Sequence, residues 1–235
     1  MEATFNKPIS QLVNENYLTA SVFEKYHIDY CCSGKRTLAD ACQKKELDTM
    51  AVMEDLEAVT NGNSYIQQRV ELWSTPFLID YIVSNHHQYI RINGPRIQDI
   101  IGKVAENHGD TQPETIRIAK LFSGLLAELY IHLDKEENDF FPVLASITKG
   151  EETRDTLSPG ILEKTNKELE DEHETAGSIM HEIRKLSHDF TPPEGSCATC
   201  HIAYSELLAF ERDLHRHVHL ENNVLFTRFD GYFIE

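Results

Sequence analysis

Four long stretches with the periodicity of amphipathic helices occupy most of this chain. They run at about 76–107, 113–146, 157–190 and 200–228, and segments rich in Gly, Pro and polar residues separate them. In each stretch apolar residues recur at intervals of three and four, which is the spacing of one helix face. Long helices joined by shorter connections pack as antiparallel neighbours. We therefore expect an all-α protein whose main part, residues 76–235, is an up-down-up-down four-helix bundle.

The residues before the bundle predict a small helical domain of their own, at 1–62. Its pattern divides into three short helices, at about 9–26, 37–45 and 49–59. Thr37 precedes the second helix and Asp40 lies in its first turn, as expected of an N-cap. Turn residues without apolar periodicity follow the third helix, which predicts a linker over 63–75.

The charge balance excludes one broad class of function. The chain has 22 Lys and Arg against 39 Asp and Glu, a formal net charge of −17. Such a chain repels nucleic acid, which is recognised through a basic surface. The first residues carry no basic and apolar export signal, and no apolar stretch reaches the roughly 20 residues that cross a bilayer. We expect a cytoplasmic protein that binds neither nucleic acid nor membrane.

Histidines interrupt the apolar stripes of the predicted bundle helices. The chain has 12 His. In the second and fourth helices a His is followed four residues later by a Glu on the same face, as His132 with Glu136 and His217 with Glu221. The third helix places His173 on its apolar face. His215 and His219 lie off the stripe of the fourth helix and are expected to be solvated.

The first bundle helix offers two adjacent histidines, His86 and His87. Both fit the apolar stripe, so periodicity does not choose between them. The histidines of the four helices recur at similar intervals along the chain. Antiparallel helices of similar length can therefore bring them to one level of the bundle.

Two glutamates in one apolar core repel each other unless a cation lies between them. A pair of divalent ions resolves this, because carboxylates bridge two metals while imidazoles cap each one. Nitrogen and oxygen ligands without thiolate favour iron or manganese over a structural zinc site. The opposing interpretation is a metal-free bundle with hydrogen-bonded core histidines and an acidic surface for partner docking.

Three segments of the bundle and one before it resemble a known family. They are HLDKEENDFFP (132–142), EDEHETAG (170–177), HVHLENNVLF (217–226) and IDYCCSGKRTLADAC (28–42). Together they are similar to the iron–sulfur cluster repair di-iron proteins, in which a small domain with a vicinal Cys pair precedes a hemerythrin-like domain. The resemblance implies a centre of two non-haem iron ions. It assigns six ligands: His87, His132, Glu136, His173, His217 and Glu221.

The same resemblance implies the function. Such a protein repairs iron–sulfur clusters damaged by nitrosative or oxidative stress, by donating iron or by reducing nitric oxide at the di-iron site. Its partners are then damaged iron–sulfur proteins, with nitric oxide or oxygen as small ligands, and a homodimer through the small domain is consistent with the family. The alternative is a hemerythrin-like oxygen or nitric oxide sensor or store without turnover.

The five cysteines are too few, and odd in number, for a disulfide-stabilised secreted domain. Cys31 and Cys32 are the candidate reactive thiols, because the nearby Lys35 and Arg36 favour the thiolate. An alternative is that the pair packs as apolar residues, which is also the expectation for Cys42.

A second cysteine motif, CATCH, comprises Cys197, Cys200 and His201. It matches the attachment pattern of c-type haem. Because haem attachment normally requires export, the sequence favours a structural or redox-active CxxC.

Overall fold

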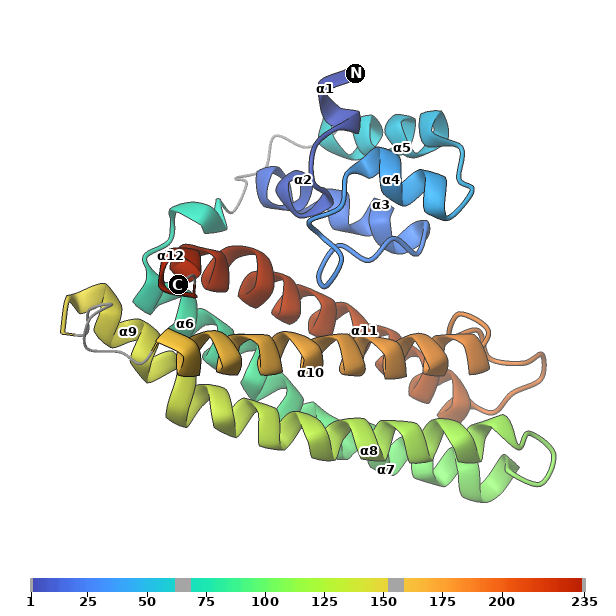
Figure 1. The fold of residues 1–235 in the computed structure, drawn as a ribbon. Coiled ribbons are helices and arrows are strands. Elements are labelled where there is room, and N and C mark those ends of the chain that lie inside the picture. The colour runs from blue at the N-terminus through green and yellow to red at the C-terminus, as the bar shows by residue number, and fades with distance from the viewer. Residues whose placement is uncertain (1, 62–68, 152–158, 234–235) are drawn as a thin grey trace. The chain divides into compact units, whose positions relative to one another are not determined.

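The computed structural model describes residues 2–61, 69–151 and 159–233, and within these ranges the chain forms helices and turns without a strand (Figure 1). The all-α prediction is therefore confirmed. Contacts divide the chain into two compact units, residues 1–74 with 218–230, and residues 75–217 with 231–235. Among the described residues, no helix is both long and apolar enough to span a bilayer.

The N-terminal unit is built from short helices. They are α1 (Glu2–Phe5), α2 (Ile9–Glu15), α3 (Thr19–Lys25), α4 (Leu38–Lys44) and α5 (Thr49–Asn61). Phe23, Leu38 and Val52 come from three of these helices and are all fully buried. Burial of large apolar side chains is the main favourable term in folding, so these residues form the core that holds the unit together.

The structure corrects the first predicted helix of this unit. Residues 9–26 form two helices rather than one, because Asn16 is extended, with φ −155°, and its Oδ1 accepts the backbone N–H of Leu18 at 3.0 Å. The predicted cap is confirmed, since Thr37 Oγ1 accepts the N–H of Asp40 at 3.1 Å. Part of the predicted linker, 63–68, lies outside the described residues. The rest includes the 3₁₀ turn η1 (Val70–Leu72).

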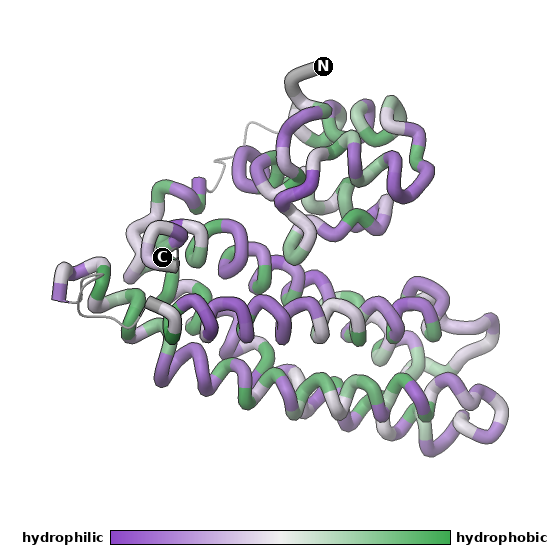
Figure 2. The backbone as a smooth tube through the Cα atoms, in the orientation of Figure 1, coloured by the Kyte–Doolittle hydropathy of each residue, from purple (hydrophilic) through white to green (hydrophobic). Residues whose placement is uncertain are grey.

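The second unit contains the long helices. In chain order the elements are α6 (Thr75–Tyr81), η2 (Ile82–His87), α7 (Gln88–His108), α8 (Glu114–Lys135), η3 (Glu136–Phe140), α9 (Phe141–Lys149), α10 (Pro159–Leu186) and α11 (Ala198–Leu220). Figure 1 shows α7, α8, α10 and α11 side by side. In Figure 2 hydrophilic and hydrophobic residues alternate around the turns of α8, as expected of a helix with one buried face. The predicted helical bundle is therefore present.

The bundle helices pack closely. The rings of Phe122 and Phe210 meet edge to face, with centroids 5.0 Å apart. Gly94 on α7 lies against Leu126 on α8, and a Cβ built on Gly94 would stand 2.4 Å from Leu126 Cδ1. A side chain at position 94 would therefore force Leu126 to shift within the core.

Three helices of the chain change from α to π geometry. The π segments are η2, η3 and η4 (Glu221–Leu225), and η4 continues α11 directly before η5 (Phe226–Phe229) and α12 (Asp230–Phe233). The N–H of Phe141 bonds the carbonyl of Glu136, and the N–H of Phe226 bonds that of Glu221, each five residues back. π turns within α-helices are often found at functional sites. Each of these three begins or ends at a predicted metal ligand.

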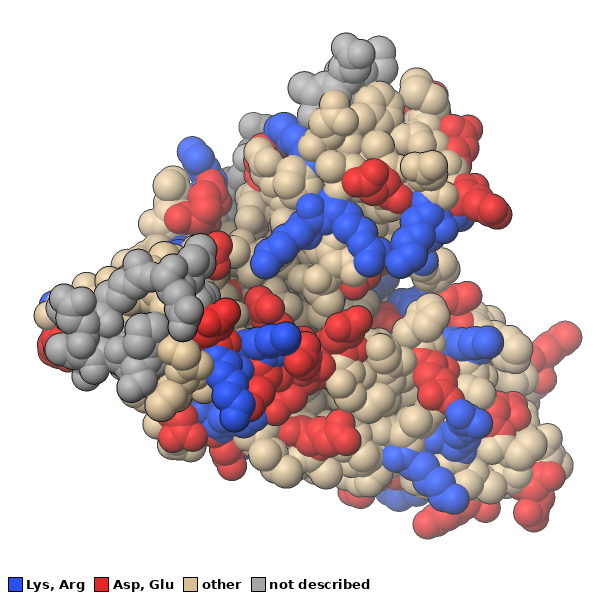
Figure 3. All heavy atoms as spheres, in the orientation of Figure 1, with Lys and Arg blue, Asp and Glu red and all other residues tan. Residues whose placement is uncertain are grey.

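Charged side chains of both signs cover the visible surface of the second unit. In Figure 3 the acidic side chains outnumber the basic ones around α8 and α10. Several of the charges pair across helices, as Arg96 with Glu206 at 2.6 Å. Such exposed pairs contribute little stability each.

Candidate metal centre

The six residues predicted as metal ligands are all buried and lie together. Two of them are glutamates without solvent exposure. The others are histidines that are 0–3% exposed. The structure groups them into two overlapping sets, one of His87, Glu136, His217 and Glu221, and one of His132, Glu136, His173 and Glu221. The ligand atoms of each set lie within 4.8 Å of one another.

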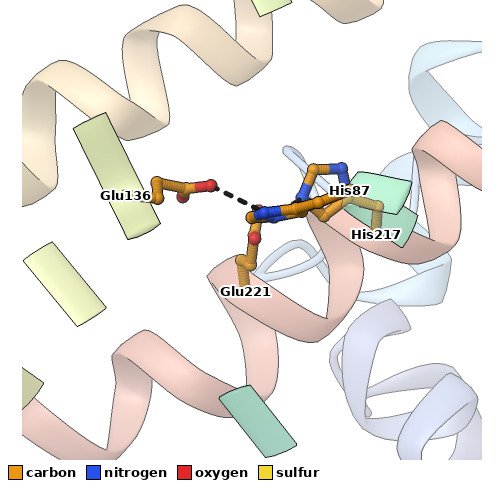
Figure 4. Close-up of side chains that lie close together, drawn as sticks. All are labelled: His87, Glu136, His217 and Glu221. Atoms are coloured by element: carbon orange, nitrogen blue, oxygen red, sulfur yellow. Dashed lines mark hydrogen bonds and ion pairs between the residues drawn. The ribbon is translucent and has the colours of Figure 1, made fainter. Parts of the chain in front are cut away.

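The first set joins the end of η2, the start of η3 and the end of α11. Nε2 of His87 lies 3.1 Å from Nε2 of His217 and 3.5 Å from Oε2 of Glu136. Figure 4 shows the side chains of His87, His217 and Glu221 converging, with Glu136 reaching toward them from the opposite side. Glu221 follows His217 by about one turn of a continuous helix, which sets their relative position.

The second set is arranged in the same way around the other histidine pair. Nε2 of His132 lies 2.9 Å from Nε2 of His173 and 3.4 Å from Oε2 of Glu136. The carboxylate of Glu136 therefore stands between two imidazoles, from different sets, at nearly equal distances. Glu136 and Glu221 are the only members that the two sets share.

Outer carboxylates determine which nitrogen of two histidines faces inward. Nδ1 of His87 lies 2.8 Å from Glu137, and Nδ1 of His132 lies 2.7 Å from Glu172. A neutral imidazole that donates through Nδ1 presents the lone pair of Nε2. Both histidines therefore direct an unprotonated nitrogen toward the shared glutamates.

Basic side chains hold these outer carboxylates in place. Arg91 donates to Glu137 at 3.1 Å, and Lys135 bonds Glu172. Hydrogen bonding from His132, assisted by Lys135, lowers the pKa of Glu172 to about 2, against the effect of its partial burial. Glu172 is therefore ionised at neutral pH and can accept the Nδ1 proton of His132. Carboxylate–histidine pairs of this kind orient metal ligands in proteins.

This donor set fits a pair of divalent cations. Two buried carboxylates in one core, with imidazole nitrogens in close pairs beside them, concentrate lone pairs that repel one another without a positive charge. Two sets that share two carboxylates provide bridging ligands for two ions. The nitrogen and oxygen donors match iron or manganese.

His86 is not a member of either set. Its Nδ1 lies 2.9 Å from Asp213, and its ring stacks on that of His217, with centroids 5.9 Å and planes 4° apart. The π segment η2 allows both His86 and His87 to be buried, since it changes the helical phase between the residues before and after it. Of the two adjacent histidines, the geometry brings His87 to the shared glutamates.

Comparison with known proteins matches both parts of the chain. Residues 78–229 match the hemerythrin HHE cation binding domain, and residues 5–60 match ScdA_N, described as a domain of unknown function (DUF542). The chain is 30% identical over 224 residues to the iron–sulfur cluster repair protein ScdA of Staphylococcus haemolyticus, covering 94% of this chain and 96% of that protein. The chain belongs to the hemerythrin-like iron–sulfur cluster repair family. Its bundle is thereby a hemerythrin-like domain of the cation-binding type.

Other members of the repair family are similar over the same length. The repair protein YtfE of Citrobacter koseri is 32% identical over 227 residues, covering 95% of this chain and 96% of its own. YtfE of Yersinia pseudotuberculosis is 32% identical over 209 residues, covering 88% and 89%. The relatives therefore contain both the small domain and the bundle.

The vicinal cysteines of this family member lie in the loop between α3 and α4. Their Sγ atoms are 3.8 Å apart, Cys31 is buried and Cys32 is partly exposed. The Asp29 carboxylate accepts the N–H groups of Cys31 and Cys32 at 3.0 and 2.9 Å, which fixes the loop. Asp29, Cys31 and Cys32 also form a compact group of potential metal-binding atoms.

The expected lowering of the thiol pKa is wrong for Cys31. The neighbouring Cys32 thiol, followed by burial and the Asp29 carboxylate, raises the pKa of Cys31 well above its usual value. The sequence argument considered Lys35 and Arg36, which are close along the chain. The residues that contact the Cys31 sulfur are instead Asp29, at 3.2 Å, and Cys32, at 3.8 Å.

Two further expectations have different outcomes. Cys42 is fully buried, which agrees with its predicted packing role. His219 is 1% exposed rather than solvated, because its Nε2 bonds Asn14 at 3.0 Å and its ring meets Tyr30 edge to face. His219 therefore belongs to the core of the unit that contains α2.

The sequence analysis also missed the two outer carboxylates. Glu137 and Glu172 each adjoin a predicted ligand in the sequence, Glu136 and His173 respectively. That adjacency was the one available signal, since their actual partners, His87 and His132, lie on other helices.

Proposed function

We propose that this protein binds two iron ions at the six-residue centre and repairs iron–sulfur clusters damaged by nitric oxide or oxidants in the cytoplasm. The observation that carries this proposal is the pair of ligand sets sharing Glu136 and Glu221. The family relationship supports it, since relatives similar over nearly the whole chain are named iron–sulfur cluster repair proteins. Its partners are damaged iron–sulfur proteins.

The residues of the centre have distinct roles in this proposal. Glu136 and Glu221, which both ligand sets share, would hold both ions, while His87 with His217 would hold one and His132 with His173 the other. When bound, the ferrous pair supplies electrons and open coordination positions for a small ligand. Glu137 and Glu172 keep two of the imidazoles in the tautomer that binds metal.

A cavity beside the centre supports the binding of a small ligand. It has a volume of about 350 Å³ and lies between α8 and α10, where His132 and His173 contribute to its wall. Leu125, Leu129 and Ala176 supply apolar surface to the same wall. Glu128, Asp171 and Glu172 also line the cavity, so its wall combines apolar surface with carboxylates. We propose this cavity as the route by which a small ligand such as nitric oxide or oxygen reaches the metals.

The cysteine loop supplies the second part of the proposed repair function. Cys31 and Cys32, with Asp29, form a small group of sulfur and oxygen donors that is suited to transient contact with iron. The raised pKa of the buried Cys31 keeps that thiol protonated until a metal displaces the proton. We propose that the pair takes part in iron delivery to a damaged cluster.

The first test is metal content per chain in protein purified without oxygen. Two irons per chain are expected in the parent, with clear loss in the Glu136→Ala/Glu221→Ala variant, whereas an iron-free parent would contradict the proposal. The loaded protein is then mixed with a nitric-oxide-damaged [4Fe–4S] protein, and recovery of cluster absorbance is followed. Recovery that depends on Cys31 and Cys32 supports repair. Reversible ligand binding without recovery would instead indicate the sensor or storage function.

A further inference from the structure

The CATCH motif lies at the opposite end of α11 from the metal centre, within the bundle unit. Cys197 immediately precedes α11, and Cys200 lies in its first turn. Between Cys200 and His217 the helix rises about 25 Å, at 1.5 Å per residue. The proposed repair function makes no use of these cysteines, so they require a separate explanation.

The two thiols differ in exposure. Cys197 is exposed, whereas Cys200 is 1% exposed. The N–H groups of Cys200 and His201 bond the carbonyl of Cys197 at 3.1 and 3.3 Å, which fixes the first turn of the helix. The exposed sulfur of Cys197 is thus held one helical turn before the buried sulfur of Cys200.

The environment of Cys197 favours its thiolate. Its Sγ lies 3.4 Å from Nε2 of His108, the last residue of α7, and the ends of α7 and α11 meet at the same end of the bundle (Figure 1). Backbone N–H bonding from Cys200, followed by the His108 side chain, lowers the pKa of Cys197. Burial raises the pKa of Cys200. A lowered pKa for one thiol and a raised pKa for the other, at a helix N-terminus and with CxxC spacing, are typical of reactive dithiols.

A bond between the two sulfurs requires Cys197 to shift toward Cys200. Residues three apart on a helix have Cβ atoms about 5–6 Å apart, and a disulfide needs about 3.5–4.5 Å. Cys197 precedes the helix, so its backbone can shift toward Cys200 with loss of only the hydrogen bonds that its carbonyl accepts from Cys200 and His201, while the helical ladder beyond them stays intact. Both cysteines are free thiols in the structure.

We propose that Cys197 and Cys200 form a reversible redox dithiol that exchanges with a low-molecular-weight disulfide of the glutathione class. The Cys197 thiolate attacks one sulfur of that disulfide, the disulfide bond breaks, and one small thiolate leaves. The Cys200 thiol gives its proton to the small thiolate already released and attacks Cys197 Sγ, and the second small thiolate leaves. Two protein thiols are oxidised to one disulfide while one small disulfide is reduced to two thiols, so electrons and protons balance. His108 is a positioning residue that stabilises the attacking thiolate.

The burial of Cys200 argues against covalent haem at this motif. Haem attachment through CxxCH needs both sulfurs to reach the porphyrin edge. Cys200 faces the bundle interior, where its neighbours on α11 include the buried Ala203 and Tyr204. An intrahelical disulfide needs only a movement of the exposed Cys197.

The proposal is tested by equilibrating the full-length protein with mixtures of reduced and oxidised glutathione and mapping its thiols. Trypsin separates the cysteines into peptides 26–35, 37–44 and 186–212, because Lys and Arg flank each of these segments. We expect peptide 186–212 to lose two hydrogen masses as the mixture becomes oxidising. Peptide 186–212 keeping two free thiols in oxidised glutathione alone would overturn the proposal, and so would haem mass on this peptide.

Variants test the order of attack. In Cys200→Ser, glutathione is expected to remain as a mixed disulfide on Cys197, while Cys197→Ser gives no bridge.

His108→Gln should slow alkylation of Cys197 by iodoacetamide at neutral pH on the order of fivefold, because less thiolate is present. His201→Gln is the matched control, an exposed histidine of the same motif, and should leave the rate unchanged. Equal rates in the two His variants would contradict the role of His108. Because these measurements read thiols and not metal, they stand or fall independently of the repair function.

Discussion

Glu172 adjoins His173 in the sequence, yet its carboxylate bonds Nδ1 of His132 on the facing helix, at 2.7 Å. Glu137 repeats this relationship, because it adjoins Glu136 and bonds Nδ1 of His87 at 2.8 Å. Each of these two helix segments thus contributes one residue to the centre and, next to it, a carboxylate that orients an imidazole from another helix. The tautomers of these histidines are therefore coupled to the packing of the bundle.

Replacing such an outer carboxylate should weaken metal binding without removing a ligand. For Glu172→Gln we expect iron affinity to fall by about 10- to 100-fold, because the amide no longer accepts the Nδ1 proton as a carboxylate does. Competition with a chelator measures the change. Glu174→Gln, an exposed neighbour on the same helix, is the control and should bind iron as the parent does. Equal iron affinity in both variants would show that the contact between Glu172 and His132 does not affect iron binding.

Replacing a shared glutamate should change the free energy of unfolding in opposite directions with and without metal. In metal-free protein we expect Glu136→Gln to raise the free energy of unfolding by about 1–2 kcal/mol, because a neutral amide is less costly to bury than a carboxylate. With iron bound, the same change should lower it. Urea unfolding with and without a chelator measures both quantities. The exposed Glu128→Gln should alter neither by more than about 0.5 kcal/mol, and a metal-free variant less stable than the parent would argue against charge repulsion at the centre.

The adjacent histidines of η2 should separate into a ligand and a packing residue. His87→Ala is expected to remove iron, whereas His86→Ala should keep the full iron content. Loss of His86 leaves the partly buried Asp213 without this hydrogen bond, which should cost about 1–3 kcal/mol of unfolding free energy. Elemental analysis and thermal unfolding of the two variants provide the test. Iron loss in His86→Ala and retention in His87→Ala would reverse the assignment.

Two glycines of α7 should respond oppositely to the same substitution. Gly94→Ala places a Cβ 2.4 Å from Leu126 Cδ1, so we expect a loss of about 1–3 kcal/mol of stability from forced repacking. Gly102→Ala meets no atom within 4 Å and should stabilise the helix by about 0.5–1 kcal/mol. Chemical denaturation of both variants measures the contrast. A neutral Gly94→Ala would mean that the Leu126 side chain moves aside easily at this point.

The reactivity of Cys197 should depend on pH in a defined direction. Its lowered pKa means that the thiolate, the reacting form, persists to lower pH than in an ordinary thiol, whose pKa is about 8.5. The groups that face it are the imidazole of His108 and the backbone N–H groups of Thr199 and Cys200, with the Cys200 thiol nearby. The pH at which the alkylation rate is half its maximum should therefore be lower for Cys197 than for an ordinary thiol. His108→Gln should raise this midpoint pH. A midpoint that His108→Gln leaves in place would assign the shift to the helix N-terminus alone.

Apolar periodicity predicted the helices of the bundle and placed five of the six candidate ligands on buried faces, because both depend on which residues share a helix face, whereas the choice of His87 over His86 came from the family resemblance. His132 with Glu136, and His217 with Glu221, needed only that information. The π segments were not predictable in the same way, because a hydrogen bond to the fifth residue back requires no particular side chain. Asn138 bonds the carbonyl of Asp134 within η3, but Asn93 makes the same type of bond inside a regular α-helix. An asparagine alone is therefore no marker of a π turn.

Predictions that depended on contacts between distant residues were less successful. The pKa of Cys31 was judged from Lys35 and Arg36, whereas Asp29 and Cys32 contact its sulfur. His219 was expected in solvent because it lies off the stripe of its own helix, but Asn14 and Tyr30 of the small domain bury it. In both cases the deciding neighbour is one that helical periodicity does not consider.

The π segments at His87, Glu136 and Glu221 have a consequence for protein engineering. A π turn contains one residue more than the α turn it replaces, so the apolar stripes before and after it differ in phase. Grafting the six residues onto the straight helices of an idealised bundle would rotate part of each helix away from its packing face. A designer who transfers this centre must therefore lengthen three of the host helices by a residue each, at the height of the metals.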